Sequence, residues 1–246
     1  MEKTQSFTEV KDRSNTKFLA KVFGYMFIGL LITAAVSFGW SLAIAYFLVD
    51  SNGYITDTGL TAIIATAIIG GIGGIIVPII NGIISIKTGK APWIGYIIYA
   101  ICIGLLFSLV MLGGIDLGVV AEAFAITALA FGSMFLVGFF SKKNLNWLGM
   151  IAMGLSVSVL LTSLFWGLFY LFAPSAAIIL DYLVSLAVIA IAMIFVAIDT
   201  YNIKQISEKG ENNNNVALYC AFTMYADFIM LFVKILYLLS SSKRNN

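Results

Sequence analysis

Long hydrophobic segments, separated by short polar ones, repeat along almost the whole chain. Each is near or above the ~20 residues that a helix needs to cross a bilayer. The pattern predicts seven helices, near residues 18–49, 60–86, 93–113, 118–140, 147–172, 177–206 and 216–239. We expect an all-α integral membrane protein, with an N-terminal tail (1–17), one membrane domain (18–240) and a short C-terminal tail (241–246).

The composition agrees with this reading. Hydrophobic residues make up 61% of the 246 residues, charged residues only 11%, and the mean hydropathy is +1.02. A soluble domain of this length needs far more polar surface. No basic patch predicts a nucleic-acid partner, so the expected surroundings are the lipid bilayer. The first hydrophobic segment is too long for a signal peptide and lacks a small-residue cleavage site, which favours a permanent helix.

Histidine is absent, and the two cysteines lie inside hydrophobic segments. Cys102 and Cys220 are typical of small buried hydrophobic residues and predict neither a disulfide nor a metal site. Without histidine, the usual switch near neutral pH and the Ser–His and Cys–His mechanisms are excluded. We therefore expect no cofactor, and any pH response must come from carboxylates.

Positive charges alternate between the connections and predict the orientation. They lie before the first helix and in the second, fourth and sixth connections: Lys3, Lys11, Arg13, Lys17, Lys21, Lys87, Lys90, Lys142, Lys143, Lys204 and Lys209. The other connections carry only acidic residues: Asp50, Asp57, Asp116 and Asp181. We expect a cytoplasmic N-terminus, in a bacterial plasma membrane. Lys243 and Arg244 do not fit this alternation, because seven spanning helices place them on the outer side. The last helix either spans the membrane or re-enters it, and we favour spanning.

Five charged residues lie within the predicted helices: Glu122, Asp181, Asp199, Asp227 and Lys234. Such residues are rare in bilayers and are functional candidates. Asp181, near the outer end of its helix, is expected to be structural or capping. Glu122 is expected either to cap its helix or to contribute to an ion entry path. Lys234 either helps to close a pathway or extends its ammonium group toward the outer interface.

Asp199 and Asp227 have a particular spacing. Their midpoint is residue 213, within a polar connection, so an antiparallel hairpin turning there brings them to similar depth. Two carboxylates in a partly dehydrated site cannot easily both ionise, so such a pair holds one proton between them over some pH range. A deprotonated pair could instead bind a hard cation such as calcium through its oxygens. The alternative is that each aspartate separately accepts hydrogen bonds from neighbouring groups.

Within the segment 60–86, Gly70 and Gly74 are four residues apart and Pro78 follows. This spacing of small residues lets two membrane helices approach closely. The proline removes a backbone hydrogen bond and can bend the helix. We expect close helix packing here, with a hinge beside a pathway as the alternative.

Four segments resemble the Bax inhibitor-1 family of transmembrane Bax inhibitor motif proteins. They are "FLAKVFGYMFIGLLITAAVSF" (18–38), "AEAFAITALAFGSMFLVGFFSKKNLNWLG" (121–149), "VAIDTYNIKQI" (196–206) and "LYCAFTMYADFIMLF" (218–232). The resemblance runs in order over nearly the whole chain. It implies seven helices with helix 7 enclosed by helices 1–6, and an association with pH-sensitive calcium leak. It also implies that Asp199 and Asp227 are the pH-sensing pair of bacterial members, and Glu122 falls on a family position.

The chain departs from the family pattern at one expected ion pair. Bacterial relatives carry a glutamate on helix 2 and an arginine late in helix 7. Here helix 2 has no such glutamate, and Tyr237 stands ten residues after Asp227, where the arginine is expected. A gate that relies on this ion pair is therefore in doubt. Lys234 is a possible substitute for the arginine, without an evident acidic partner on helix 2.

Three classes of function remain. The leading prediction is a calcium leak channel gated by Asp199 and Asp227, with calcium and protons as its ions. The alternatives are a proton-coupled transporter and a membrane interaction protein that modulates stress or cell-death responses. We do not expect an enzyme, because "YADF" around Asp227 lacks the G-x-G-D context of aspartyl intramembrane proteases.

Overall fold

The computed structural model describes residues 2–50, 54–88, 92–172, 174–210 and 213–244, with the backbone alone for 2–15, 86, 166–169, 174–175 and 244. Parts of four predicted connections, at 51–53, 89–91, 173 and 211–212, lie outside the described residues, and Lys90 is among them. The side chains of Lys3, Lys11 and Arg13 also lie outside the description.

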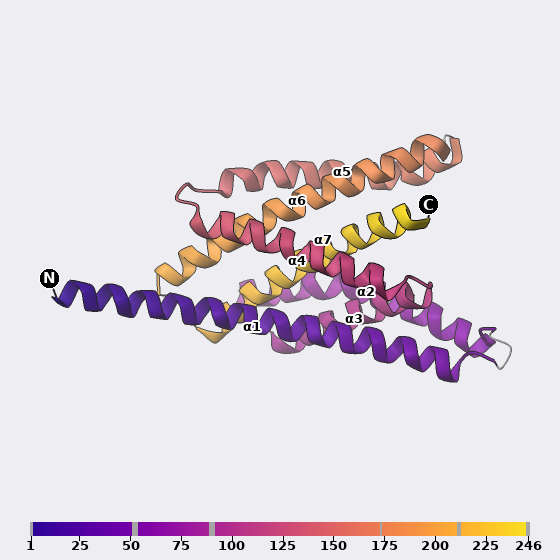
Figure 1. Cartoon of the computed structure of the whole chain (residues 1–246), viewed down its shortest axis with the longest axis horizontal. Helices are drawn as coiled ribbons and strands as arrows, with labels where there is room; N and C mark the ends of the chain where they lie inside the picture. Colours follow the sequence, from indigo (N-terminus) through magenta and orange to yellow (C-terminus); the bar gives the residue numbers. More distant parts are fainter. Residues whose placement is uncertain (1, 51–53, 89–91, 173, 211–212, 245–246) are drawn as a thin grey trace. The chain divides into compact units, whose positions relative to one another are not determined.

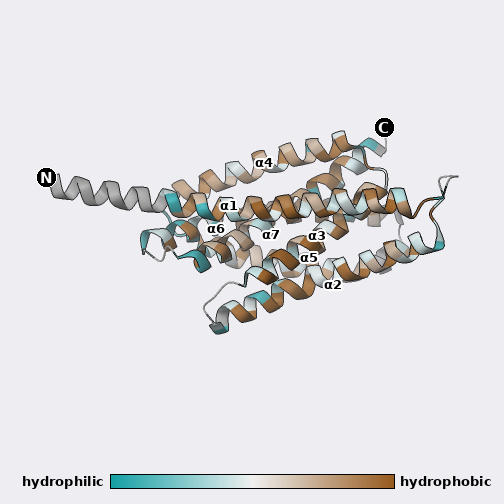
Figure 2. Ribbon diagram, turned by 90° about the horizontal axis from the view of Figure 1, so that it is seen from below, coloured by the Kyte–Doolittle hydropathy of each residue, from teal (hydrophilic) through white to brown (hydrophobic). Residues whose placement is uncertain are grey.

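Seven α-helices make up most of the described chain, as the hydrophobic pattern predicts (Figure 1). They are α1 (Glu2–Phe47), α2 (Asp57–Thr88), α3 (Trp93–Leu112), α4 (Leu117–Phe140), α5 (Asn146–Phe172), α6 (Pro174–Glu208) and α7 (Asn214–Arg244). Each contains a segment long and apolar enough to cross a membrane. Hydrophobic residues run along the helices, and hydrophilic ones gather at several of their ends (Figure 2). The prediction of an all-α, multi-pass membrane fold is confirmed.

Two predicted boundaries are wrong. α1 begins at Glu2 rather than near residue 18, and α7 continues to Arg244 rather than ending near 239. Residues 2–17 are polar but include neither glycine nor proline, so no residue in this stretch interrupts a helix. Polarity marked the edge of the hydrophobic segment correctly, since the part of α1 apolar enough to span begins at Thr16. It did not mark the end of the helix.

The chain divides into two compact units. The first comprises Met1–Asp116 and Glu211–Tyr225, and the second comprises Leu117–Gly210 and Ala226–Asn246. α7 contributes its first part to one unit and its remainder to the other, as a single unbroken helix (Figure 1).

Glycines allow close helix packing in the first unit. A Cβ atom placed on Gly70 of α2 would lie 3.0 Å from the Cys102 carbonyl oxygen of α3. A Cβ on Gly104 of α3 would lie 2.8 Å from the Thr33 carbonyl oxygen of α1. The distance at Gly104 is shorter than real Cβ contacts and the one at Gly70 is tighter than most of them, so a larger residue at either position would force its neighbours to shift. The predicted close packing at Gly70 is confirmed.

Hydroxyl groups join α1, α3 and α7 in the same unit. The Thr33 and Tyr225 hydroxyls lie 2.6 Å apart, and Thr33 also donates to the Ala100 carbonyl at 3.1 Å. Tyr96 donates to the Tyr25 carbonyl at 2.9 Å. Thr33 is 5% exposed and Tyr225 is fully buried. Each hydroxyl therefore has a partner, which removes most of the cost of burying it.

The second unit also depends on a close approach, between α4 and α6. A Cβ on Gly138 would lie 2.9 Å from Thr200 Cβ and would also contact the Ala197 carbonyl oxygen. Nearby, Lys204 of α6 donates to the Phe139 carbonyl at 2.9 Å. This carbonyl belongs to the last turn of α4, where helix carbonyls lack partners within the helix. The lysine thus supplies a missing partner and fixes the end of α4 against α6.

Candidate functional site

The two membrane aspartates lie in the second unit, on α6 and α7. Asp199 stands between the buried residues Ile198 and Thr200, and Asp227 precedes the buried Phe228. Phe228 packs against Phe124 and Phe131 of α4, with each pair of ring centroids 5.5 Å apart. Aromatic packing therefore fixes the turn of α7 that carries Asp227.

The structure brings the two carboxylates into electrostatic interaction. Asp227 is partly buried, its Oδ2 atom is sealed from solvent, and that atom has no hydrogen-bond partner among the described residues. Burial is the larger influence on the charged form of Asp227, and the negative charge of Asp199 adds to it. A low-polarity environment and a neighbouring negative charge both disfavour a second ionised carboxylate. The arrangement suits a pair that shares one proton.

The hairpin of α6 and α7 has the predicted antiparallel sense. The interaction of Asp199 with Asp227 is followed by one of Asp181 with Tyr237, so residues earlier in α6 meet residues later in α7. α7 begins at an N-cap, where the Asn213 side chain accepts from the Val216 N–H at 2.8 Å. One of the asparagines in the predicted loop therefore defines the start of α7.

A second polar cluster lies further along the hairpin. The Tyr237 hydroxyl donates to Oδ2 of Asp181, and the Lys234 Nζ lies 5.8 Å from the centre of the Tyr237 ring. With Thr162, Ser163 and Val184, these three residues line a pocket of about 440 Å³. Asp181 thus has a structural contact, as expected. Its partner Tyr237 was missed, although the midpoint of these two residues, residue 209, also falls in the connection between α6 and α7.

The other two predicted site residues lie apart from the aspartate pair. Lys234 belongs to the pocket just described. Glu122, in the second turn of α4, forms an ion pair with Lys243 of α7 at 3.0 Å, and both side chains are about half exposed. Glu122 therefore does not cap α4. Lys243 does not fit the charge pattern but pairs with Glu122 near the start of α4. This contact is expected if α7 runs its full length and does not turn back.

No cluster of three or more histidine, cysteine, aspartate or glutamate side chains that could hold a metal occurs among the described residues. Asp199 and Asp227 supply two carboxylates, whereas calcium takes six to eight oxygen ligands. A calcium ion at this pair would need backbone carbonyls and water to complete its shell.

These features define a class: a polytopic helical membrane protein with a partly buried pair of aspartates on neighbouring helices. Comparison with known proteins identifies the family. The model of the family described as "Inhibitor of apoptosis-promoting Bax1" matches residues 15–245, so the chain belongs to this family.

Curated relatives are similar over nearly their whole length. An uncharacterized protein of Rickettsia prowazekii, RP147, is 29% identical over 98% of this chain and 96% of its own. YrjE of Lactococcus lactis, also uncharacterized, is 27% identical over 89% of this chain and 88% of its own. The inner membrane protein YbhL of Escherichia coli is 26% identical over 89% of both chains.

Proposed function

We propose that this protein is a pH-sensitive calcium leak channel, gated by a proton-sharing pair formed by Asp199 and Asp227. The observation that carries the proposal is the buried Oδ2 of Asp227, which has no hydrogen-bond partner among the described residues and lies under the influence of the Asp199 charge. An unmatched carboxylate in a membrane helix costs stability, and such costs are typical of functional sites.

The proton determines the state of the gate. When the pair holds one proton, a carboxyl group can donate to the neighbouring carboxylate and draw α6 and α7 together. When that proton is lost at higher pH, two negative charges repel each other and attract a cation. Calcium flux should therefore rise with pH. Asp199 is the charged group found to act on Asp227 among the described residues, so the pair is the source of the pH response.

The proposal includes the arrangement that the family resemblance implies, with helix 7 enclosed by helices 1–6. Burial supports this, because 56% of the residues in the apolar segment of α7 are buried, whereas the share in the other helices is 6% to 39%. The alternating lysines support a cytoplasmic N-terminus. The printed name of YbhL, an inner membrane protein, supports a bacterial plasma membrane.

The aspartate pair also fits the alternative of a proton-coupled transporter, in which the shared proton is itself carried across. A leak needs only the gradient of its own ion, whereas coupled transport stops when the proton gradient is removed. A role as an interaction protein in stress responses requires neither a calcium leak nor proton-coupled transport. We assign no enzymatic role.

The test is calcium entry into liposomes that contain the purified protein, measured between pH 5 and pH 8 without a proton gradient. Wild type should show flux that rises with pH. Asp227→Asn should lose the pH dependence, because an amide neither takes up nor releases a proton in this range. Asp57→Asn is the matched control, since Asp57 is an exposed carboxylate in the first turn of α2. This variant should keep the wild-type pH profile.

Different results would contradict different parts of the proposal. An absence of protein-dependent calcium flux at every pH would rule out the leak. A flux that keeps its full pH dependence in Asp227→Asn would leave the channel but remove the gate. A flux that appears only with an imposed proton gradient would favour the transporter.

A further inference from the structure

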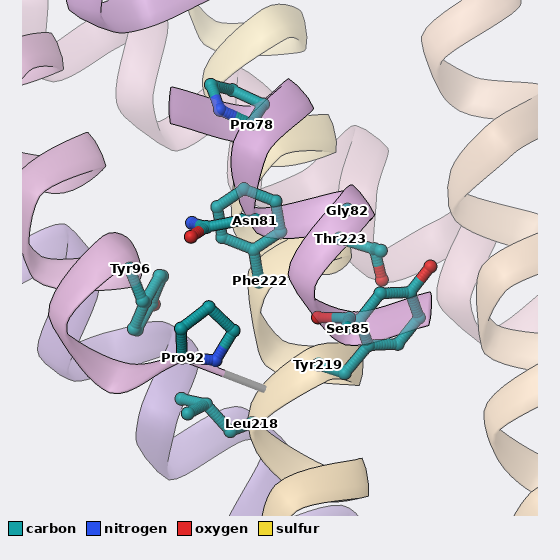
Figure 3. A pocket seen from close by; sticks show the side chains of 10 residues that line it. All are labelled: Pro78, Asn81, Gly82, Ser85, Pro92, Tyr96, Leu218, Tyr219, Phe222 and Thr223. Atoms are coloured by element: carbon teal, nitrogen blue, oxygen red, sulfur yellow. The ribbon is translucent and has the colours of Figure 1, made fainter. Parts of the chain in front are cut away.

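The first unit contains a pocket whose lining does not include either aspartate of the pair. It has a volume of about 150 Å³, space for on the order of ten water molecules. Ten residues line it: nine from α2, α3 and α7, and Pro92 just before α3 (Figure 3). Its polar members are Asn81, Ser85, Tyr219 and Thr223, with the Tyr96 ring beside them. No charged side chain is among the lining residues.

Asn81 is the unusual member. The residue is 5% exposed, and its side chain makes no hydrogen bond with any residue that the structure describes. Gly95 of α3 leaves room for it, because a Cβ there would coincide with the Asn81 amide. A primary amide offers two donors and one acceptor. Burying these groups without partners is costly, so the pocket that Asn81 lines should hold their partner.

Hydroxyl groups occupy another side of the pocket. Figure 3 shows the oxygens of Ser85, Tyr219 and Thr223 gathered there, away from the Asn81 amide. Thr223 donates to the Cys220 carbonyl at 3.0 Å, which leaves its oxygen to accept a bond. Tyr219 lines the pocket and is 47% exposed, so the pocket opens at the surface of the unit beside this residue. The pocket therefore presents both donors and acceptors, all of them neutral.

The position of the pocket indicates where its ligand comes from. Ser85 lies three residues before the end of α2 and Leu218 four residues after the start of α7, about 5 Å from each helix end. Asn81 and Thr223 lie further from these ends, seven residues before the end of α2 and nine residues after the start of α7, about 10 Å and 14 Å along the helices. Pro78, Pro92 and Phe222 give the pocket apolar walls, and α2 carries the exposed side chains Ile79 and Ile83 beside it.

We propose that this pocket binds the glycerol head of an uncharged glycerolipid, with diacylglycerol as the chemical type. The glycerol hydroxyl and ester carbonyls supply what the Asn81 amide and the three hydroxyls lack. The acyl chains lie along the isoleucine face of α2. A phosphate-bearing lipid is not our choice, because the lining residues among those that the structure describes include no cationic side chain to pair with its charge.

Native mass spectrometry of the full-length protein in detergent tests this proposal. The probes are diacylglycerol, phosphatidylglycerol and phosphatidylcholine with the same acyl chains, each added in a titration. We expect one diacylglycerol to be retained per protein at concentrations where neither phospholipid is. Asn81→Leu and Thr223→Val should each weaken retention about fivefold, the factor that corresponds to one lost hydrogen bond. Thr162→Val in the second unit is the matched control and should retain lipid as wild type does.

The outcomes separate the proposal from its rivals. Equal retention of the three lipids would overturn the selection of an uncharged head. Equal diacylglycerol retention by wild type and both pocket variants would mean that the lipid binds outside this pocket. Preferential retention of phosphatidylglycerol would overturn the choice of an uncharged lipid. Because Thr223→Val preserves shape, its loss of lipid with an unchanged melting temperature would distinguish a lost contact from misfolding.

Discussion

The two units differ in whether a described buried polar atom is left sealed without a partner. In the first, the buried hydroxyls of Thr33, Tyr96 and Tyr225 have partners, and the Asn81 amide lines a pocket. Two side-chain atoms among the described residues are fully sealed and unpartnered, Ser185 Oγ and Asp227 Oδ2, and both belong to the second unit. The first unit thus uses polarity for stability. The second unit retains the free-energy cost of two sealed, unpartnered polar atoms, and a structural role does not explain this cost.

The largest effect should come from the close approach of α4 and α6 in the second unit. Gly138→Leu should lower the free energy of unfolding by about 3 kcal/mol, because its side chain would collide with the Ala197 carbonyl and Thr200. Gly132→Leu, on the same helix with open space at its Cβ, should cost far less. Thermal unfolding in detergent compares the two. Equal losses would mean that leucine harms α4 wherever it is placed.

A smaller loss is expected from the matched hydroxyls of the first unit. Thr33→Val should cost about 2 kcal/mol, because it leaves the fully buried Tyr225 hydroxyl without this partner. Thr33→Ser restores the hydroxyl and should recover most of the stability. The same unfolding assay measures both variants. A neutral Thr33→Val would show that these hydroxyls are not what holds α1 and α7 together.

At Asp227, the difference between the two units predicts that a substitution stabilises the protein. Asp227→Asn should raise the free energy of unfolding by about 1 kcal/mol at pH 8, because it removes a buried charge next to Asp199. At pH 5 the gain should shrink, since the wild-type pair then keeps its proton. Melting temperatures at the two pH values test this, and a destabilised variant at pH 8 would contradict it.

The smallest effect should be at the exposed ion pair. Lys243→Gln breaks the contact with Glu122 but should change the free energy of unfolding by less than about 0.5 kcal/mol, because both groups reach solvent. The same measurement in low and high salt should give the same small value. A loss above 1 kcal/mol would show that this pair anchors the end of α7.

Sequence periodicity predicted the seven helices because membrane-crossing segments must be long and apolar. Hairpin spacing likewise predicted that Asp199 and Asp227 meet, since it depends only on helix rise and on one connection. The partners of Glu122 and Thr33 could not be found in this way. Glu122 lies 121 residues from Lys243 and Thr33 lies 192 residues from Tyr225, and the packing of helices that are not consecutive decides both contacts.

Asn81 shows another limit of sequence reasoning. An asparagine among isoleucines near a helix end is typical of an interface residue. The pocket around it forms only when α3 places Gly95 against its amide and α7 places Thr223 opposite. The residue is visible in the sequence, but the space beside it results from three helices together.

The unbroken course of α7 through both units has a mechanical consequence. A helix is stiff in torsion, and Tyr219, Thr223 and Asp227 follow one another at intervals of four residues, on one face. A rotation of α7 that moves the carboxylate therefore turns the two pocket residues through the same angle. If both proposals hold, a lipid that resists this torque also resists opening, and the energetic coupling must act equally in the reverse direction.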